Sequence, residues 1–229
     1  MPVLAATVSG SMAIAQPALP IAPLPGGCAP ETLTRLVVRD ISPGVAAADS
    51  RAQPRTMVRR GAMQLRSEEL PDLSRGGETR LVIISEPDVW TIDLARRRGV
   101  HSVDPGPEFV VRAPVLPITP DLPALFATLE FGCEAAFVAA NAPKAAQVGA
   151  PWGTSQVSVH SVNIGEHSLA FLMDSRTSKP VIITYSKAER AVFSIRYDAF
   201  RNDQPDNPTL FTPPKSVQIV EAATAVGKP

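Results

Sequence analysis

The sequence predicts a mainly β protein, in which a curved antiparallel sheet forms an unclosed half-barrel with a helical lid. Apolar and polar residues alternate along short segments that end at Gly, Pro or Asp-rich turns, as in half-buried strands. Four such segments follow one another between residues 156 and 200. Helical periodicity is confined to one stretch, residues 119–141. Many strands with so little helix indicate a concave sheet face that can hold an apolar ligand.

Composition excludes several classes of protein. The chain has 229 residues, and its 22 basic side chains balance 22 acidic ones, so no global charge indicates binding to nucleic acid. No apolar run reaches the ~18 residues that a membrane-spanning helix needs. We interpret a local group of arginines as a solvated strand edge that discourages edge-to-edge pairing. These are Arg51, Arg55, Arg59, Arg60 and Arg66.

The N-terminus predicts export. Residues 1–15 are small and apolar, and Ala13-Ile14-Ala15 matches the A-x-A pattern of a secretory cleavage site, although a basic segment before them is missing. We therefore predict a candidate signal peptide and a periplasmic or otherwise exported protein, with a disordered tail as the alternative. Residues 16–30 are proline-rich and predict a linker. Residues 31–223 then form a single β domain, and 224–229 a tail.

The strands are expected at nine places along the domain. Residues 79–117 form a meander in which Trp90, Ile92 and Leu94 share one face. In the last strand, Phe193, Ile195 and Tyr197 share a face. The nine expected strands cover 33–41, 57–66, 81–84, 90–94, 100–103, 156–163, 168–174, 181–186 and 191–200.

The helical lid is expected at residues 122–131. A threonine cap, a proline in the first turn and an acid near the N-terminus precede it at Thr119-Pro120-Asp121. Apolar residues then follow at i, i+3, i+4 and i+7, which gives one apolar stripe: Leu122, Leu125, Phe126 and Leu129. A second, Ala-rich helix is expected at 134–141, before Pro143.

The two cysteines, Cys28 and Cys133, predict a disulfide if the protein is exported. The bridge would close a loop of about 105 residues, worth on the order of 4–5 kcal/mol. An alternative is a degenerate lipobox at 24–28, with an acylated Cys28 as lipid anchor, which the prolines before it disfavour. In a cytoplasmic protein, both thiols would be free.

No catalytic pattern is present in the sequence. His101, His160 and His167 lack the spacing of metal ligands, so no metal site is predicted. Neither a G-x-S-x-G elbow nor a glycine-rich phosphate loop occurs. We therefore predict a protein that is not an enzyme and that needs no cofactor.

Three stretches carry a resemblance to a known family. Residues 207–219 (NPTLFTPPKSVQI), Ser194-Ile195-Arg196-Tyr197 and Val89-Trp90-Thr91-Ile92-Asp93 resemble the periplasmic outer-membrane lipoprotein carrier (Lol-type) family. Ser216 stands where that family often has glycine, and the family's interior arginine matches no single arginine here. The resemblance, spread over about residues 33–221, implies an unclosed barrel with a helical lid and a hydrophobic cavity for acyl chains.

These observations predict a periplasmic carrier or binding protein for lipid or lipoprotein acyl chains. Its partners would be an acyl chain or lipoprotein cargo and a membrane-bound donor or acceptor protein, without nucleic acid. The alternative is a non-enzymatic envelope protein-interaction or assembly module with a filled core. The predicted ligand-binding residues are apolar and would otherwise fill a dry core: Trp90, Ile92, Leu94, Leu125, Phe126, Leu129, Phe171, Phe193, Ile195 and Tyr197.

Overall fold

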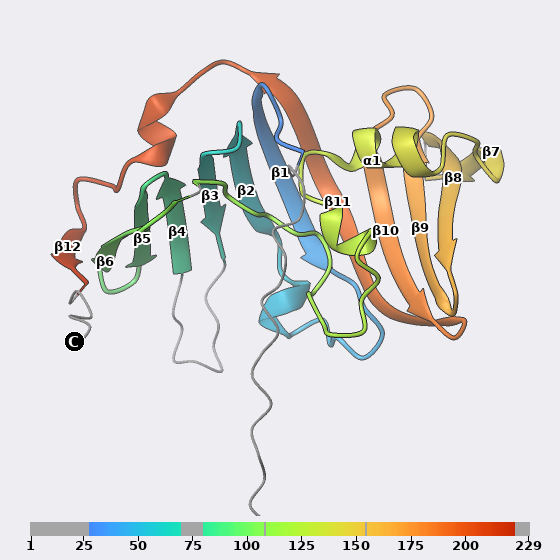
Figure 1. The fold of residues 1–229 in the computed structure, drawn as a ribbon, viewed down its shortest axis with the longest axis horizontal. Helices are drawn as coiled ribbons and strands as arrows, with labels where there is room; N and C mark the ends of the chain where they lie inside the picture. The colour runs from blue at the N-terminus through green and yellow to red at the C-terminus, as the bar shows by residue number, and fades with distance from the viewer. Residues whose placement is uncertain (1–27, 70–79, 108, 154, 223–229) are drawn as a thin grey trace, which may run out of the picture.

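The fold is a single curved sheet of twelve strands that does not close into a barrel (Figure 1). A computed structural model describes the chain outside its two ends and three internal gaps. The candidate signal peptide, nearly all of the predicted linker and the predicted 224–229 tail lie outside the described residues. The described ranges are 28–69, 80–107, 109–153 and 155–222.

Two meanders build the sheet. The strand order is β12-β6-β5-β4-β3-β2-β1-β11-β10-β9-β8-β7, so the first meander joins the second where β1 pairs with β11. All neighbours are antiparallel except β12 and β6, which are parallel. The strands are β1 (Leu33–Asp40), β2 (Arg55–Arg60), β3 (Gln64–Glu68), β4 (Arg80–Ser85), β5 (Asp88–Asp93), β6 (Arg98–Val103), β7 (Gln147–Trp152), β8 (Ser155–Ile164), β9 (His167–Asp174), β10 (Pro180–Lys187), β11 (Arg190–Gln204) and β12 (Gln218–Glu221).

The predicted mainly β fold with an unclosed sheet is confirmed, with one error among the expected strands. The segment 57–66 is not one strand but the hairpin of β2 and β3, which pair through Met57 and Ser67. The chain turns at Gly61, whose φ of 59° is a left-handed conformation that glycine adopts without a steric penalty. Strands β7 and β12 were not predicted.

The predicted lid helix over 122–131 is wrong. Only a single 3-10 turn, η3 (Phe126–Thr128), forms there; Leu129 is extended, Glu130 forms an isolated antiparallel bridge with Pro114, and Phe131 lies in a turn. Beyond the turn, the backbone pairs with an earlier stretch, since the Val115 N–H donates to Leu129 O (3.0 Å) and the Phe131 N–H to Ala113 O (2.9 Å).

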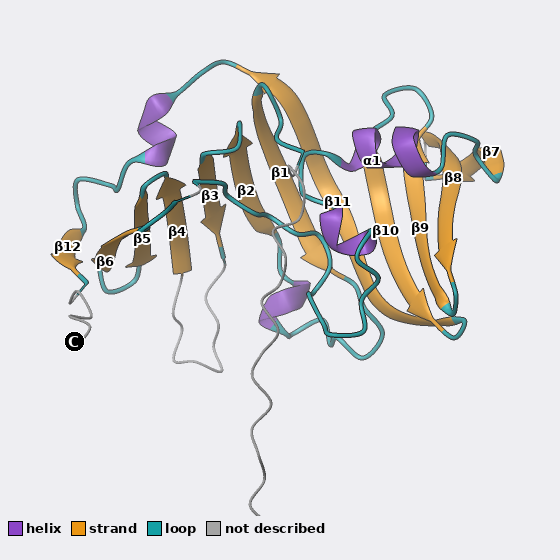
Figure 2. Cartoon of the chain, in the orientation of Figure 1, coloured by secondary structure: helices purple, strands orange, loops and turns teal. Residues whose placement is uncertain are grey.

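The second predicted helix is confirmed as α1 (Glu134–Asn141). Together, residues 111–142 run across one face of the sheet, and we name them the crossing segment (Figure 2). Two further short helices in the described ranges are η1 (Ser50–Ala52), between β1 and β2, and η4 (Pro208–Phe211), after β11. No helix in the described ranges is both long and apolar enough to span a membrane.

The sheet carries a separate apolar core on each face. On β2, Met57 belongs to one core and its neighbour Val58 to the other, as the alternation of a strand requires. The crossing segment covers the larger core, which we name the crossing core. Residues 207–219, the C-terminal cover, pack on the opposite face over a smaller C-terminal core built from Leu81, Ile83 and Ile92 among others.

Candidate ligand-binding site

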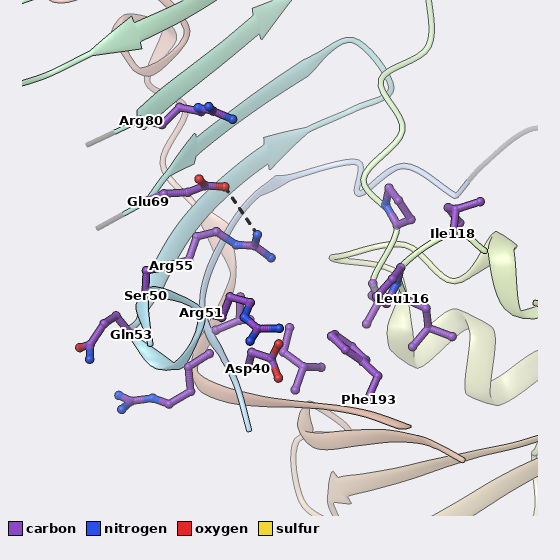
Figure 3. A pocket seen from close by; sticks show the side chains of 16 residues that line it. Asp40, Ser50, Arg51, Gln53, Arg55, Glu69, Arg80, Leu116, Ile118 and Phe193 are labelled. Atoms are coloured by element: carbon purple, nitrogen blue, oxygen red, sulfur yellow. Dashed lines mark ion pairs between the residues drawn. The ribbon is translucent and has the colours of Figure 1, made fainter. Parts of the chain in front are cut away.

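A pocket of about 440 Å³ opens beside the crossing core (Figure 3). Its lining comes from β1 and β11 in the middle of the sheet, from the ends of β2 to β4, from η1, and from residues 114–118 of the crossing segment. The volume lies within the roughly 300–1,000 Å³ range of small-molecule sites. The pocket therefore has the size of a ligand site.

One wall of the pocket is apolar. Residues 114–118, the sequence Pro-Val-Leu-Pro-Ile, face Val38, Phe193 and Ile195. Ile195 is buried, whereas Ile118 remains 55% exposed. The flanking prolines suit an extended chain that needs few backbone hydrogen bonds. This wall offers an apolar surface that is only partly covered.

The other wall is polar and mostly basic. Arg39, Arg51, Arg55 and Arg80 line it with Asp40 and Glu69. Arg51 pairs with Asp49 at 2.7 Å, and its side-chain hydrogen bond lowers the pKa of the Asp49 carboxyl to about 2. Arg55 lies farther from its acid, 3.7 Å from Nη1 to Glu69 Oε1. The pocket is thus amphipathic, with a basic wall opposite an apolar one.

A buried charge cluster ties the crossing segment to β2. Arg59, only 1% exposed, donates to the carbonyl oxygens of Phe131 and Val111, each at 3.0 Å. Its Nη2 also lies 2.5 Å from Oε2 of Glu130, which is completely buried. The half-buried Arg112 contacts the other oxygen of Glu130. The interpretation of the local arginines as a solvated edge is therefore wrong for Arg59, whose donors satisfy carbonyls of an irregular segment.

The predicted disulfide between Cys28 and Cys133 is present, with its Cα atoms 5.9 Å apart. It joins the residues before β1 to the N-terminus of α1, so the sulfur of Cys28 is not available for the alternative lipid anchor. The next residue, Glu134, is completely buried and accepts hydrogen bonds from Tyr197 Oη (2.7 Å) and the Gly132 N–H (3.1 Å).

Burial is the main cause of the shifted pKa values of Glu134 and Tyr197. Loss of hydration raises the pKa of the Glu134 carboxyl to about 7, against the opposing effect of the Tyr197 hydrogen bond. Burial, together with the Glu134 carboxyl, raises the pKa of Tyr197 well above its ordinary value. A carboxyl with such a pKa is protonated in a substantial part of the folded molecules near neutral pH.

The ten predicted ligand-binding residues do not come together in space. Trp90, Ile92 and Leu94 belong to the C-terminal core, on the opposite face from the other seven. Of those seven, only Phe193 and Ile195 line the pocket. The others fill or flank the packed core under the crossing segment: Leu125, Phe126, Leu129, Phe171 and Tyr197. Their role in ligand binding stays a prediction.

Sequence reasoning missed Leu116, Ile118 and the arginines of the basic wall. The available signal was an apolar stretch between two prolines, which is unsuited to a central strand and can cover a sheet instead. Within the described residues, no three His, Cys, Asp or Glu side chains gather as a metal site requires.

Comparison with known proteins gives a weak likeness to a few folds. No protein-family model matches the chain, and no curated protein matches it either. An uncharacterized conserved protein from Thermus thermophilus is similar with a TM-score of 0.43 and 11% identity, over 84% of this chain and 91% of that one.

Two similar structures contain MucB. The MucA/MucB complex of Pseudomonas aeruginosa gives a TM-score of 0.40 and 9% identity, covering 84% of this chain and 59% of that one. MucB alone gives a TM-score of 0.39 and 10% identity, covering 83% of this chain and 60% of that one. This chain thus spans about three fifths of the MucB chains. At these TM-scores, the likeness carries no argument about the site, which rests on its own residues.

Proposed function

We propose that this protein is an exported carrier or binding protein that holds an acyl chain of a lipid or lipoprotein in the pocket beside the crossing core. The observation that carries the proposal is the apolar wall at 114–118, Phe193 and Ile195, which is left partly open to solvent. Apolar surface that is concave and exposed gains free energy when an apolar ligand covers it. The chemistry is binding, without a catalytic step or a cofactor.

The size of the possible gain supports an acyl chain. Burying a chain of ~16 carbons contributes roughly 12 kcal/mol gross, at about 0.8 kcal/mol per methylene, before the costs of ordering are subtracted. An acyl chain that only partly enters the pocket gains this free energy in proportion to the number of methylenes that it buries. The disulfide supports an oxidising compartment such as the periplasm.

A second candidate function is a protein-interaction or envelope-assembly module. It is favoured by the crossing core itself, because Phe126, Leu129 and Phe171 are fully buried and belong to one apolar core where the lid and cavity were expected. In that case the crossing segment serves as a structural cover. The pocket would then bind no acyl chain.

The experiment that tests the proposal starts from protein purified from the periplasm. Native mass spectrometry should find a bound lipid, and the emptied protein should take up a fluorescent fatty acid. Replacing Ile118, 55% exposed in the apolar wall, by Asp should weaken uptake at least tenfold and leave the melting temperature nearly unchanged. The control is Val148→Asp, at a residue 73% exposed on β7. Lipid-free protein that also takes up no fatty acid would overturn the proposal.

A further inference from the structure

The pocket concentrates positive charge in a chain that has none overall. The whole sequence has equal numbers of acidic and basic residues, 22 of each. The pocket, by contrast, is lined by four arginines and only two acids, Asp40 and Glu69. The excess lies on the wall opposite the apolar residues (Figure 3). A ligand that lies along the apolar wall therefore meets guanidinium groups across the pocket.

Two of the four arginines already have close acidic partners. Arg39 contacts the Asp198 carboxylate through Nε at 2.6 Å and Nη2 at 2.5 Å. Arg51 contacts Asp49 in the same two-atom manner, through Nε and Nη2. A bidentate pair with a carboxylate uses one side of the guanidinium fork. These two residues have the least capacity left for a ligand.

Arg55 and Arg80 have fewer contacts with acidic side chains of the described residues. The ion pair of Arg55 is the single 3.7 Å contact with Glu69, and its Nε is buried without a hydrogen-bond partner among the described residues. Arg80, at the start of β4, forms no ion pair with any residue of the described ranges. Figure 3 shows Arg80, Glu69 and Arg55 in a row along one wall, each belonging to a neighbouring part of the sheet.

We propose that the ligand of this pocket is an anionic amphiphile, whose carboxylate or phosphate group binds Arg55 and Arg80 while its acyl chain lies on residues 114–118 and Phe193. This inference rests on the proposed function and specifies its ligand class. Guanidinium groups present planar, paired donors that match the oxygen atoms of carboxylates and phosphates.

The test compares amphiphiles that share one acyl chain and differ in the head group. Below their micelle concentrations, each competes with a fluorescent fatty acid for the emptied protein: lysophosphatidylglycerol, lysophosphatidylcholine, the free fatty acid and the uncharged monoacylglycerol. We expect the anionic ligands to bind about tenfold more tightly than the uncharged one, which is about 1.4 kcal/mol. The advantage should shrink between about 50 mM and about 500 mM NaCl, because salt screens exposed charges.

The outcomes separate this inference from the proposed function. Equal affinities for all four amphiphiles overturn the inference and leave acyl-chain binding intact. Absence of binding by every one of them overturns both. Preference for the fatty acid over lysophosphatidylglycerol identifies a carboxylate ligand, and the reverse order identifies a phosphate-bearing lipid.

Variants of Arg55 and Arg80 test whether these two residues bind the anionic group. Arg80→Gln and Arg55→Gln should each reduce the anionic preference, and together they should abolish it, while the affinity for monoacylglycerol stays the same. The matched control is Arg60→Gln, at an arginine that is paired with Asp206 and does not line the pocket. Arg55 also lies over the Phe131 ring, 5.9 Å from its centroid, so Arg80→Gln is decisive where Arg55→Gln unfolds. An unchanged preference in a folded Arg80→Gln protein overturns the assignment of Arg80.

Discussion

The two faces of the sheet are covered by segments of similar irregularity that are held in different ways. In both, an arginine on a strand donates to a carbonyl of the cover: Arg59 on β2 to Phe131 and Val111, and Arg66 on β3 to Leu210. Arg59 is 1% exposed and pairs with the buried Glu130, whereas Arg66 is 16% exposed and pairs with Glu68 near solvent. Only the crossing segment carries the disulfide.

This difference shows what an irregular cover requires. A segment without helix or ladder exposes carbonyls to the core, and each must find a donor. Where the cover is deep, the donor is a buried cation, and a buried cation requires a buried acid. Where the arginine is closer to solvent, as at Arg66, a surface ion pair suffices. The crossing face is therefore expected to depend on charge, and the C-terminal face on apolar anchors.

The strongest test of this comparison is Arg59→Ala. The change removes two carbonyl partners and leaves Glu130 in the interior without its buried cation. We expect the free energy of unfolding to fall by about 3–5 kcal/mol, measured by urea denaturation. The control is Arg66→Ala on the other face, where solvent screening limits the loss to about 1 kcal/mol. Equal losses for the two arginines would contradict the comparison.

Phe211→Ala tests the apolar anchors of the C-terminal cover. Phe211 is 2% exposed and packs in the C-terminal core. Truncating such a side chain costs about 3 kcal/mol, since it loses burial and leaves a cavity. Binding of a fluorescent fatty acid by the folded fraction should not change, because the pocket belongs to the other face. Ligand loss without loss of stability would show that the two faces are not independent.

The strands illustrate how much of the fold the sequence predicts. From β8 to β11, apolar alternation and polar turns predict the strands to within a few residues, because one face of each strand is buried. The strand expected at 57–66 was wrong, because Gly61 stands without the neighbouring Pro, Asn or Asp that usually marks a turn. Helical periodicity failed at 122–131, where Phe126 and Leu129 are buried, and Leu122 and Leu125 partly buried, on an irregular backbone.

The buried charge cluster beneath the crossing segment was less predictable for a physical reason. An arginine in a strand has the same local pattern whether it is solvated, as at Arg60, or buried, as at Arg59. Its burial depends on Glu130 and on two carbonyls that lie 52 and 72 residues away in the chain. Such long-range partners leave no periodic signal in the sequence. Pairing of Cys28 with Cys133 was predictable only because the chain offers no other cysteine.

Glu134 makes the crossing face sensitive to pH. Its pKa is about 7 in the folded protein and 4.5 ordinarily. Between these values the unfolded chain has released the proton and the folded one retains it, so stability falls as pH rises, by about 1.4 kcal/mol per unit for full separation. Stability from this carboxyl is thus present below pH 4.5 and lost as pH rises through about 7.

The variant Glu134→Gln should remove this dependence. Gln keeps an acceptor for Tyr197 and the Gly132 N–H but cannot ionise. Relative to the unmodified protein, we expect no gain near pH 4 and a gain on the order of 3 kcal/mol near pH 8, in urea denaturation at each pH. Parallel stability curves for the two proteins across this range would refute a buried, protonated Glu134.

The smallest expected effect concerns His101. This residue of β6 contacts Glu221 of the edge strand β12 and stacks on Trp90, which packs against the C-terminal core. Its ring contacts Asp88 (2.8 Å) and Glu221 (2.7 Å) and stacks on Trp90 with ring centroids 5.2 Å apart. Hydrogen bonds to Asp88 first and to Glu221 second raise the pKa of His101 above 6.5. The contribution of the charged ring to stability is therefore present below pH 6.5 and lost as pH rises through the higher folded pKa.

Because Glu221 is 76% exposed, the loss should stay below about 1 kcal/mol and loosen β12 without unfolding the sheet. The chain has two tryptophans, so Trp152→Phe leaves Trp90 as the reporter of this site. Its emission should change over a single transition above pH 6.5, and the transition should disappear in His101→Gln. His167→Gln, which removes a ring stacked on Tyr185 instead, should leave it in place. If the transition persists without His101, another group causes it. The C-terminal face would then be stabilised by its apolar anchors and not by the charge of His101.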